Sequence, residues 1–231
     1  MPGSTHSRRA VIASALVYVA AWLAGLALLP IGADPHAGAA EVSTVLADNA
    51  TAAVIQSWLV HGVAAIALVW FVGSALRMLA PGPHTRIGST VTRLAAVGAA
   101  AASLLQVAFL HAAVAAASPV TPGVAAAFVH AVNVTDMIKL VLLGTVAGGL
   151  TIMLVRAGAG PWFSRPALGL AVLLPLAGLA FVSAAPLLGG MLAASLVLLL
   201  GWALFAAVFT VRLSEPADGS VAVVESKREK R

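Results

Sequence analysis

The stretch GMLAASLVLLLGWALFAAVFTV, residues 190–211, decides the fold class of this chain. It contains no charged residue, and a helix of this length rises roughly 30 Å, the thickness of the hydrocarbon core of a membrane. Five similar apolar runs precede it, at about 10–30, 54–80, 92–117, 135–156 and 166–187. The sequence therefore predicts an all-α, polytopic membrane protein, a bundle of six transmembrane helices.

Composition supports a membrane protein and excludes several other classes. Of the 231 residues, 61% are hydrophobic and 9% charged, whereas soluble domains carry about 25% charged residues. The absence of cysteine excludes disulfides and thiolate metal sites. Phosphate-loop, zinc-protease, serine-hydrolase and dinucleotide motifs are missing, and the basic residues form no nucleic-acid-binding face. We therefore expect neither enzymatic activity, nor a cofactor, nor nucleic-acid binding.

The distribution of charge predicts how the chain crosses the membrane. With both termini in the cytoplasm, twelve of the thirteen Lys and Arg residues lie on the cytoplasmic side, as the positive-inside rule requires, and Lys139 is the exception. We expect a cytoplasmic N-terminus at 1–9, a transmembrane domain at 10–212 and a disordered basic cytoplasmic tail at 213–231. Cleavage of the first run as a twin-arginine signal is a rival reading, but its apolar core is longer than the 7–15 residues usual for signal peptides.

Two regions leave the helix boundaries open. The last two runs are separated only near Pro186, Gly189 and Gly190, where we expect a tight turn. A single helix from Thr121 to Arg156 would be about 54 Å long. Because this length exceeds the membrane core, we expect residues 122–134 to protrude, to lie at the interface or to form a separate short helix.

Small residues recur at four-residue spacing within the spans, as Gly98 with Ala102 and Gly144 with Gly148. This spacing lets helix backbones approach closely in lipid. We interpret both pairs as packing positions of the bundle.

Histidine recurs inside the apolar runs, in QSWLVH at 56–61 and QVAFLH at 106–111. His61 and His111 are expected at a similar depth, roughly 10 Å below the outer face, where they could face each other across neighbouring antiparallel helices. A separation of five residues places each glutamine and its histidine on different faces of an α-helix.

Further polar residues surround these histidines in the expected topology. Asp136 and Lys139 are three residues apart, so they can form an ion pair on one helix face near the outer boundary. Ionisable residues at membrane depth are costly and usually face a bundle interior or a cavity. The candidate polar cluster consists of His61, His111, His130, Asp136 and Lys139, with Gln106 deeper in the membrane.

Three uses of this cluster are open. His61 and His111 could ligate haem iron axially, or bind copper or zinc together with His130. A histidine and a carboxylate could instead couple protons to the movement of a small solute. The polar side chains could also simply hydrogen-bond between helices, and this structural role is favoured because interhelical hydrogen bonds of modest strength are common in membrane proteins.

Three stretches resemble a group of uncharacterised bacterial integral membrane proteins that share a domain of unknown function. They are LADNATAAVIQSWLVHGVAAIALVWFVGSAL, FVHAVNVTDMIKLVLLGTVAGGLTIMLVR and GPWFSRPALGLAVLLPLAGLAFV. The resemblance implies a six-helix bundle in a bacterial plasma membrane and carries no established activity. The lipid bilayer is the expected partner, and a membrane-protein partner or a second copy of the chain is left open.

Overall fold

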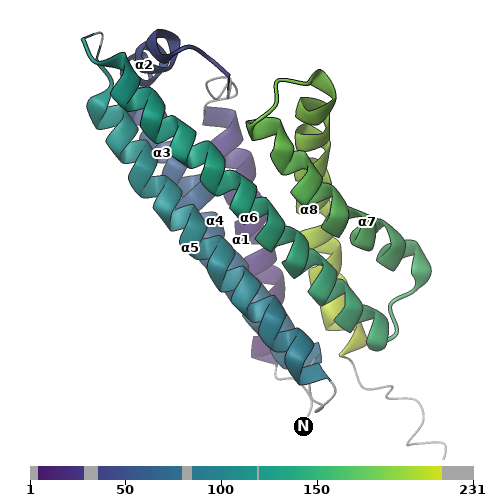
Figure 1. Cartoon of the computed structure of the whole chain (residues 1–231). Coiled ribbons are helices and arrows are strands. Elements are labelled where there is room, and N and C mark those ends of the chain that lie inside the picture. The colour runs from purple at the N-terminus through teal and green to yellow at the C-terminus, as the bar shows by residue number, and fades with distance from the viewer. Residues whose placement is uncertain (1–4, 29–35, 80–84, 119, 215–231) are drawn as a thin grey trace, which may run out of the picture.

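The computed structural model describes residues 5–28, 36–79, 85–118 and 120–214, and all regular secondary structure in these ranges is helical. Six helical segments are long and apolar enough to cross a membrane, which confirms the predicted all-α six-helix bundle (Figure 1). They are α1 (Thr5–Leu28), the continuous segment Ala50–Leu79, α5 (Arg86–Ala116), α6 (Pro122–Arg156), the segment Pro161–Phe181 and α8 (Pro186–Leu213).

Two of these segments are composite, and one further helix is short. The second span joins α3 (Ala50–Ser57), a π-helical turn η1 (Trp58–Val63) and α4 (Ala64–Leu79). The fifth joins α7 (Pro161–Ala177) to a 3₁₀ turn, η3 (Gly178–Phe181). The short helix α2 (Ala39–Asp48) precedes the second span.

The turn between the last two spans lies a few residues earlier than expected, because prolines begin helices in this fold. Pro122, Pro161 and Pro186 lie in the first turns of α6, α7 and α8, where a proline leaves no intrahelical hydrogen bond unmade. The turn between the last two spans is therefore 182–185, and Gly189 and Gly190 lie inside α8. The expected tail lies outside the described residues from 215 onward.

Residues 122–134 form neither a separate helix nor a loop, since α6 is continuous over 35 residues. At 1.5 Å per residue it is roughly 52 Å long, so one end protrudes, as one of the expected arrangements required. Helix α2 covers the protruding ends of α5 and α6 through a small apolar cluster, and the Ser43 hydroxyl donates to the Ser118 carbonyl at 3.0 Å. The cluster comprises Val42, Leu46, Ala53, Ala113 and Ala125.

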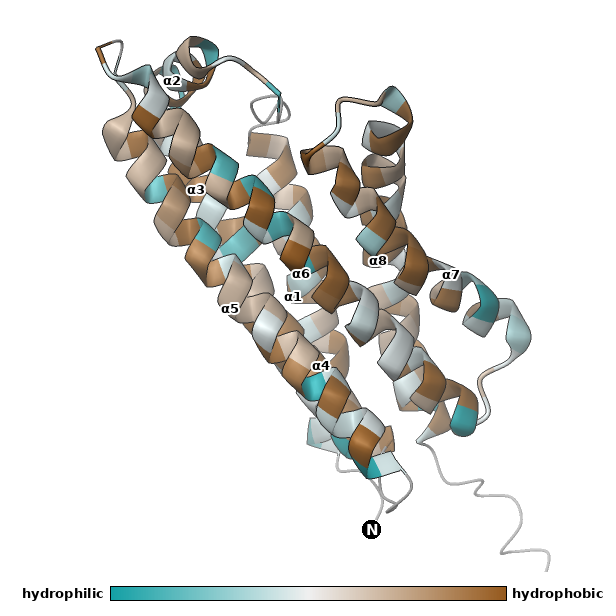
Figure 2. Ribbon diagram, in the orientation of Figure 1, coloured by the Kyte–Doolittle hydropathy of each residue, from teal (hydrophilic) through white to brown (hydrophobic). Residues whose placement is uncertain are grey.

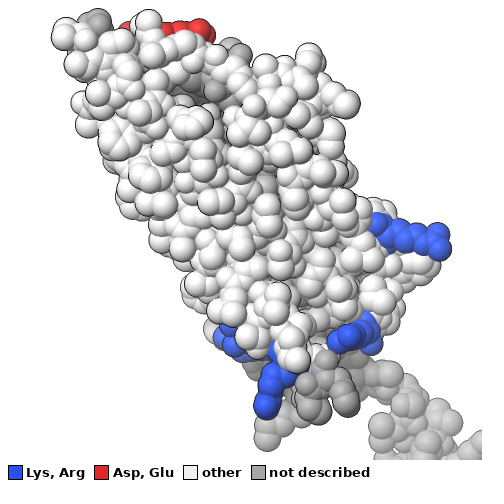
Figure 3. Space-filling view, in the orientation of Figure 1, with Lys and Arg blue, Asp and Glu red and all other residues white. Residues whose placement is uncertain are grey.

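Charge separates the two ends of the bundle. On the face shown in Figure 3, Lys and Arg side chains gather toward the end opposite the acidic residues. Arg77, Arg156 and Arg212 lie in the last turns of α4, α6 and α8, and Glu41 lies in the first turn of α2. We call the end of the bundle with these arginines the basic end and the end with Glu41 the α2 end.

Close helix packing holds the interior together. A Cβ added at Gly144 of α6 would lie 2.6 Å from the carbonyl oxygen of Ala171 in α7, and one at Gly148 would lie 3.3 Å from the Ala171 Cβ. These glycines therefore let α6 and α7 approach, in agreement with the interpretation of their spacing. In the same interior, the Trp202 indole donates a hydrogen bond to the Thr151 hydroxyl at 3.2 Å, and its ring packs edge-on against Phe71.

Candidate functional site

The polar site is built on the middle of α6. Lys139 is 17 residues from either end of this helix and its side chain is only 4% exposed. An ion pair joins Lys139 to Asp136, one turn earlier on the same helix, as the three-residue spacing predicted. In Figure 2, hydrophilic positions interrupt α5 and α6 in the half nearer α2.

Two other spans supply the remaining partners of the Lys139 ammonium. It donates to Gln106 Oε1 of α5 at 2.8 Å and lies 3.3 Å from His61 Nδ1 of η1. An ammonium group has three N–H donors, so Asp136, Gln106 and His61 together satisfy it. It also lies 5.7 Å from the centre of the Trp22 ring on α1, within the range of a cation–π contact.

Gln106 fixes the register of α5 against α6. It is fully buried, and while its side-chain oxygen accepts from Lys139, its Nε2 donates to the backbone carbonyl of Val132 at 3.2 Å. One amide therefore satisfies a charged donor and a backbone acceptor on the same neighbouring helix. The sequence predicted Gln106 as part of the polar cluster but did not indicate which groups it bonds to.

We expect Gln106→Leu to destabilise the protein by about 1–3 kcal/mol, because the buried Lys139 ammonium loses one of its acceptors and the bond from α5 to the Val132 carbonyl is lost. The loss should appear as unfolding at a lower fraction of sodium dodecyl sulfate in mixed micelles, followed by circular dichroism. Thr145→Val is the control, since this exposed hydroxyl bonds only to Val141 of its own helix. Equal stability of both variants would contradict the bridging role.

The two histidines are used differently. The His61 ring faces Lys139, whereas His111 Nδ1 lies 2.7 Å from the Val107 carbonyl of its own helix and its ring packs edge-on against Trp58, with centroids 6.0 Å apart. His130 is exposed on α6. No group of three metal-binding side chains occurs within the described residues. Haem ligation by His61 and His111 thus remains a prediction of the sequence.

A central cavity of about 450 Å³ opens beside the ion pair. Its polar side carries Ser57, His61, Asn133, Asp136 and Lys139, together with Gln56. Most of the remaining lining is apolar and comes from several helices, with Leu140 and Leu143 of α6, Leu174 of α7 and Leu199 of α8 among it. This size and this mixture of apolar wall and few polar groups are typical of small-molecule sites.

The π-helical turn shapes the polar side of this cavity. Gln56 and His61, five residues apart, both line it, so the expectation that they face apart was wrong. Gln56 lies in the last turn of α3, just before the π turn, which carries more residues per rotation than an α turn and so brings His61 closer to the face of Gln56. Such turns frequently occur at functional sites.

Sequence reasoning also missed residues of the site. Trp22 and Asn133 line the cavity, as does Ser57, whose buried hydroxyl has no hydrogen-bond partner among the described residues. The spacing of Asn133, Asp136 and Lys139 by threes was an available signal, because such residues share a helix face. Nothing in the spacing around Ser57 indicated the π turn.

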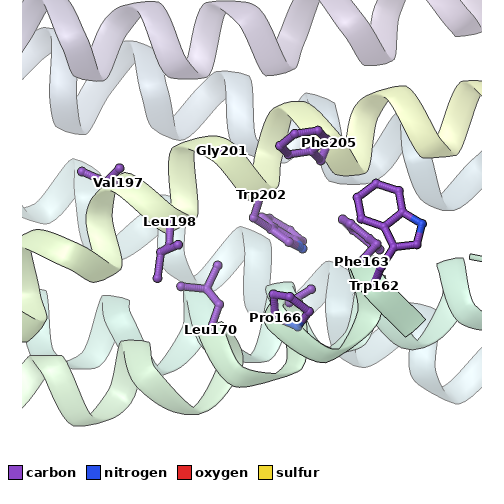
Figure 4. Close-up of a pocket in the computed structure, with 10 residues that line it drawn as sticks. Trp162, Phe163, Pro166, Leu170, Val197, Leu198, Gly201, Trp202 and Phe205 are labelled. Atoms are coloured by element: carbon purple, nitrogen blue, oxygen red, sulfur yellow. The ribbon is translucent and has the colours of Figure 1, made fainter. Parts of the chain in front are cut away.

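A second hollow, of about 390 Å³, lies between α7 and α8 (Figure 4). Trp162, Phe163 and Pro166 of α7 and Trp202 and Phe205 of α8 line it. No charged residue is among the described residues that line it, so it offers no ionic partner for a charged solute. The central cavity is the stronger functional candidate.

Comparison with known proteins assigns no role to this site, because no family model, curated protein or solved structure matches the chain. The fold and six apolar helices define a multi-pass membrane protein. Any more specific function must be argued from the cavity itself.

Proposed function

We propose that this chain is a carrier, without enzymatic activity, in a bacterial plasma membrane, and that it moves a small organic anion together with a proton through the central cavity. The bacterial membrane is supported by the family resemblance. The orientation is supported by the sidedness of the arginines, which makes the basic end cytoplasmic and the α2 end external.

One observation carries the proposal: the Asp136–Lys139 ion pair forms part of the wall of a solute-sized cavity. Ionisable residues at membrane depth are costly and commonly mark substrate and proton pathways. The Asp136 side chain is 18% exposed and the Lys139 side chain 4% exposed, so the carboxylate is the more accessible partner. A proton arriving through the cavity would therefore meet Asp136.

Charge balance indicates the class of solute. In the resting pair, the Asp136 carboxylate compensates the Lys139 ammonium. Protonation of Asp136 removes that compensation, and the carboxylate of a solute can replace it beside Lys139. The cavity is neutral before and after, so the proton and the anion enter together without burying net charge.

The apolar wall favours a monocarboxylate with a hydrophobic body. Leucines make up much of the cavity lining, among them Leu192, Leu196 and Leu199 of α8. Ser57 and Asn133 supply hydrogen-bonding groups near the polar side. A small 2-oxo or hydroxy acid fits both requirements.

We expect purified protein in liposomes to accumulate radiolabelled pyruvate or phenylpyruvate when the external medium is more acidic than the lumen. Asp136→Asn should reduce this uptake to that of protein-free vesicles, because residue 136 can no longer carry a proton. These 2-oxo acids are strong carboxylic acids that stay almost fully ionised in a mildly acidic medium, so they cross bare lipid slowly. A lumenal pH dye should report acidification in step with uptake.

Two further variants make this experiment decisive. Ser57→Leu narrows the cavity without touching the ion pair and should also lower uptake. Asp48→Asn, on the exposed surface of α2, should transport as the parent does. Uptake by the parent protein that does not exceed that of protein-free vesicles, or that survives in Asp136→Asn, would overturn the proposal.

A further inference from the structure

A groove of about 830 Å³ runs along the outside of the bundle between α4 and α5. Ile66, Trp70 and Gly73 of α4 line it together with Val97, Ala100 and Leu104 of α5. Ile66 is 62% exposed and Trp70 60% exposed, so the groove lies on the surface rather than in the interior. It is separate from the central cavity and from the carrier function proposed for it.

Matched stripes on the two helices form this groove. On α4 the lining positions 66, 70, 73 and 77 follow the spacing of one helix face, and on α5 positions 93, 97, 100 and 104 repeat it. The helices run in opposite directions, so Arg77 and Arg93 both stand at the end of the groove nearer the basic end. Each row of lining residues therefore has an arginine at one end and small or apolar residues along the rest of the groove.

The dimensions of the groove match half of a bilayer. Eleven residues separate Arg77 from Ile66 and Leu104 from Arg93, and this separation spans roughly 16 Å along a helix. The hydrocarbon core is about 30 Å thick, so one leaflet contributes about half of that. An acyl chain of one leaflet therefore fits the apolar length of the groove.

The charges at the groove mouth select the headgroup. Arg77 and Arg93 are both exposed, and Arg77 uses one donor on the Ser74 hydroxyl at 3.0 Å. A guanidinium has five donors in a planar fork that matches phosphate oxygens, so most of this capacity is available. Among the described residues, none of those lining the groove is acidic. A headgroup with net negative charge balances the two cations better than a zwitterionic one, whose ammonium would approach them.

We propose that the α4–α5 groove binds one anionic phospholipid from the leaflet at the basic end. Its phosphate lies between Arg77 and Arg93, and an acyl chain runs along Gly73, Trp70 and Val97. Basic pockets between transmembrane helices recognise anionic lipid headgroups in this way.

The test is native mass spectrometry of the full chain, released from detergent with phosphatidylglycerol or phosphatidylcholine of identical acyl chains. We expect the parent protein to bind phosphatidylglycerol roughly tenfold more tightly, as two basic contacts near a membrane surface suggest. Arg77→Gln with Arg93→Gln should remove this preference. Arg165→Gln with Arg212→Gln is the matched control, because both residues are exposed arginines outside the groove.

A groove-filling variant and a soluble competitor distinguish binding of a whole lipid from binding of its phosphate group alone. Ala100→Trp keeps both arginines but occupies the groove, and it should weaken binding of both lipids. Glycerol phosphate without acyl chains should not compete. The proposal is overturned if the Arg77/Arg93 variant keeps the preference, if the control pair loses it equally, or if Ala100→Trp binds as the parent does.

Discussion

Lys139→Met is expected to destabilise the protein by about 3–5 kcal/mol, the range for breaking a buried ion pair by removing one partner. Asp136 would lose its counter-ion, and Gln106 and His61 would lose the donor that joins them. The methionine fills nearly the same space, so lost packing contributes little. Unfolding in mixed micelles of increasing sodium dodecyl sulfate content, followed by circular dichroism, measures the difference.

The double variant Lys139→Met with Asp136→Asn distinguishes an unpaired charge from a damaged core. Without the carboxylate, no uncompensated charge remains, and we expect stability within about 1 kcal/mol of the parent. Arg165→Met, an exposed cation, should change stability by less than about 0.5 kcal/mol. A double variant no more stable than Lys139→Met alone would show that the charge of Asp136 is not the cause.

Gly144→Leu should cost about 3 kcal/mol, at the upper end of the usual range for overpacking. The first added atom would already meet the Ala171 carbonyl oxygen at 2.6 Å and the Pro175 ring at 3.0 Å. Neither is the end of a flexible side chain, so α6 and α7 must separate. The same micelle unfolding measurement reports the effect.

Gly169→Leu is the matched control for the glycine substitution, because nothing lies within 4 Å of a Cβ at this position of α7. Both changes replace a helical glycine with the same side chain, so helix propensity cancels. Gly148→Ala, which meets the Ala171 Cβ at 3.3 Å, should fall between them. If Gly144→Leu and Gly169→Leu unfold together, the α6–α7 contact does not limit stability.

The number of spans could be predicted because hydrocarbon imposes a composition that is readable without knowledge of the fold. Helix ends were harder to predict, because a proline can follow one helix or begin the next. Pro186 begins α8, so the turn that was expected near Gly189 and Gly190 lies at 182–185. The protruding end of α6 packs against α2, a tertiary contact that local sequence patterns do not predict.

The contacts of the site also fall into two groups: those within one helix, which the sequence predicts, and those between helices, which it does not. The Asp136–Lys139 pair was predictable because a three-residue spacing on one helix fixes it. The bridge from Gln106 to Lys139 depends on the register between two helices, which the sequence of either one leaves open. His61 and His111 share the same short motif but enter different surroundings, because only the first motif contains a π turn.

That turn has a consequence for how the protein can evolve. A π turn holds one more residue than the α turn it replaces, and in an α-helix each residue rotates the chain by about 100°. Deleting one residue between Trp58 and Val63 would let the turn relax to α. The α turn completes the same rotation with one residue fewer, so Gln56 and Ser57 would keep their places in the cavity wall while the span shortens by only about 1.5 Å. The loss of a single codon would thus remove one side chain of the turn and leave the residues on either side facing the same neighbours.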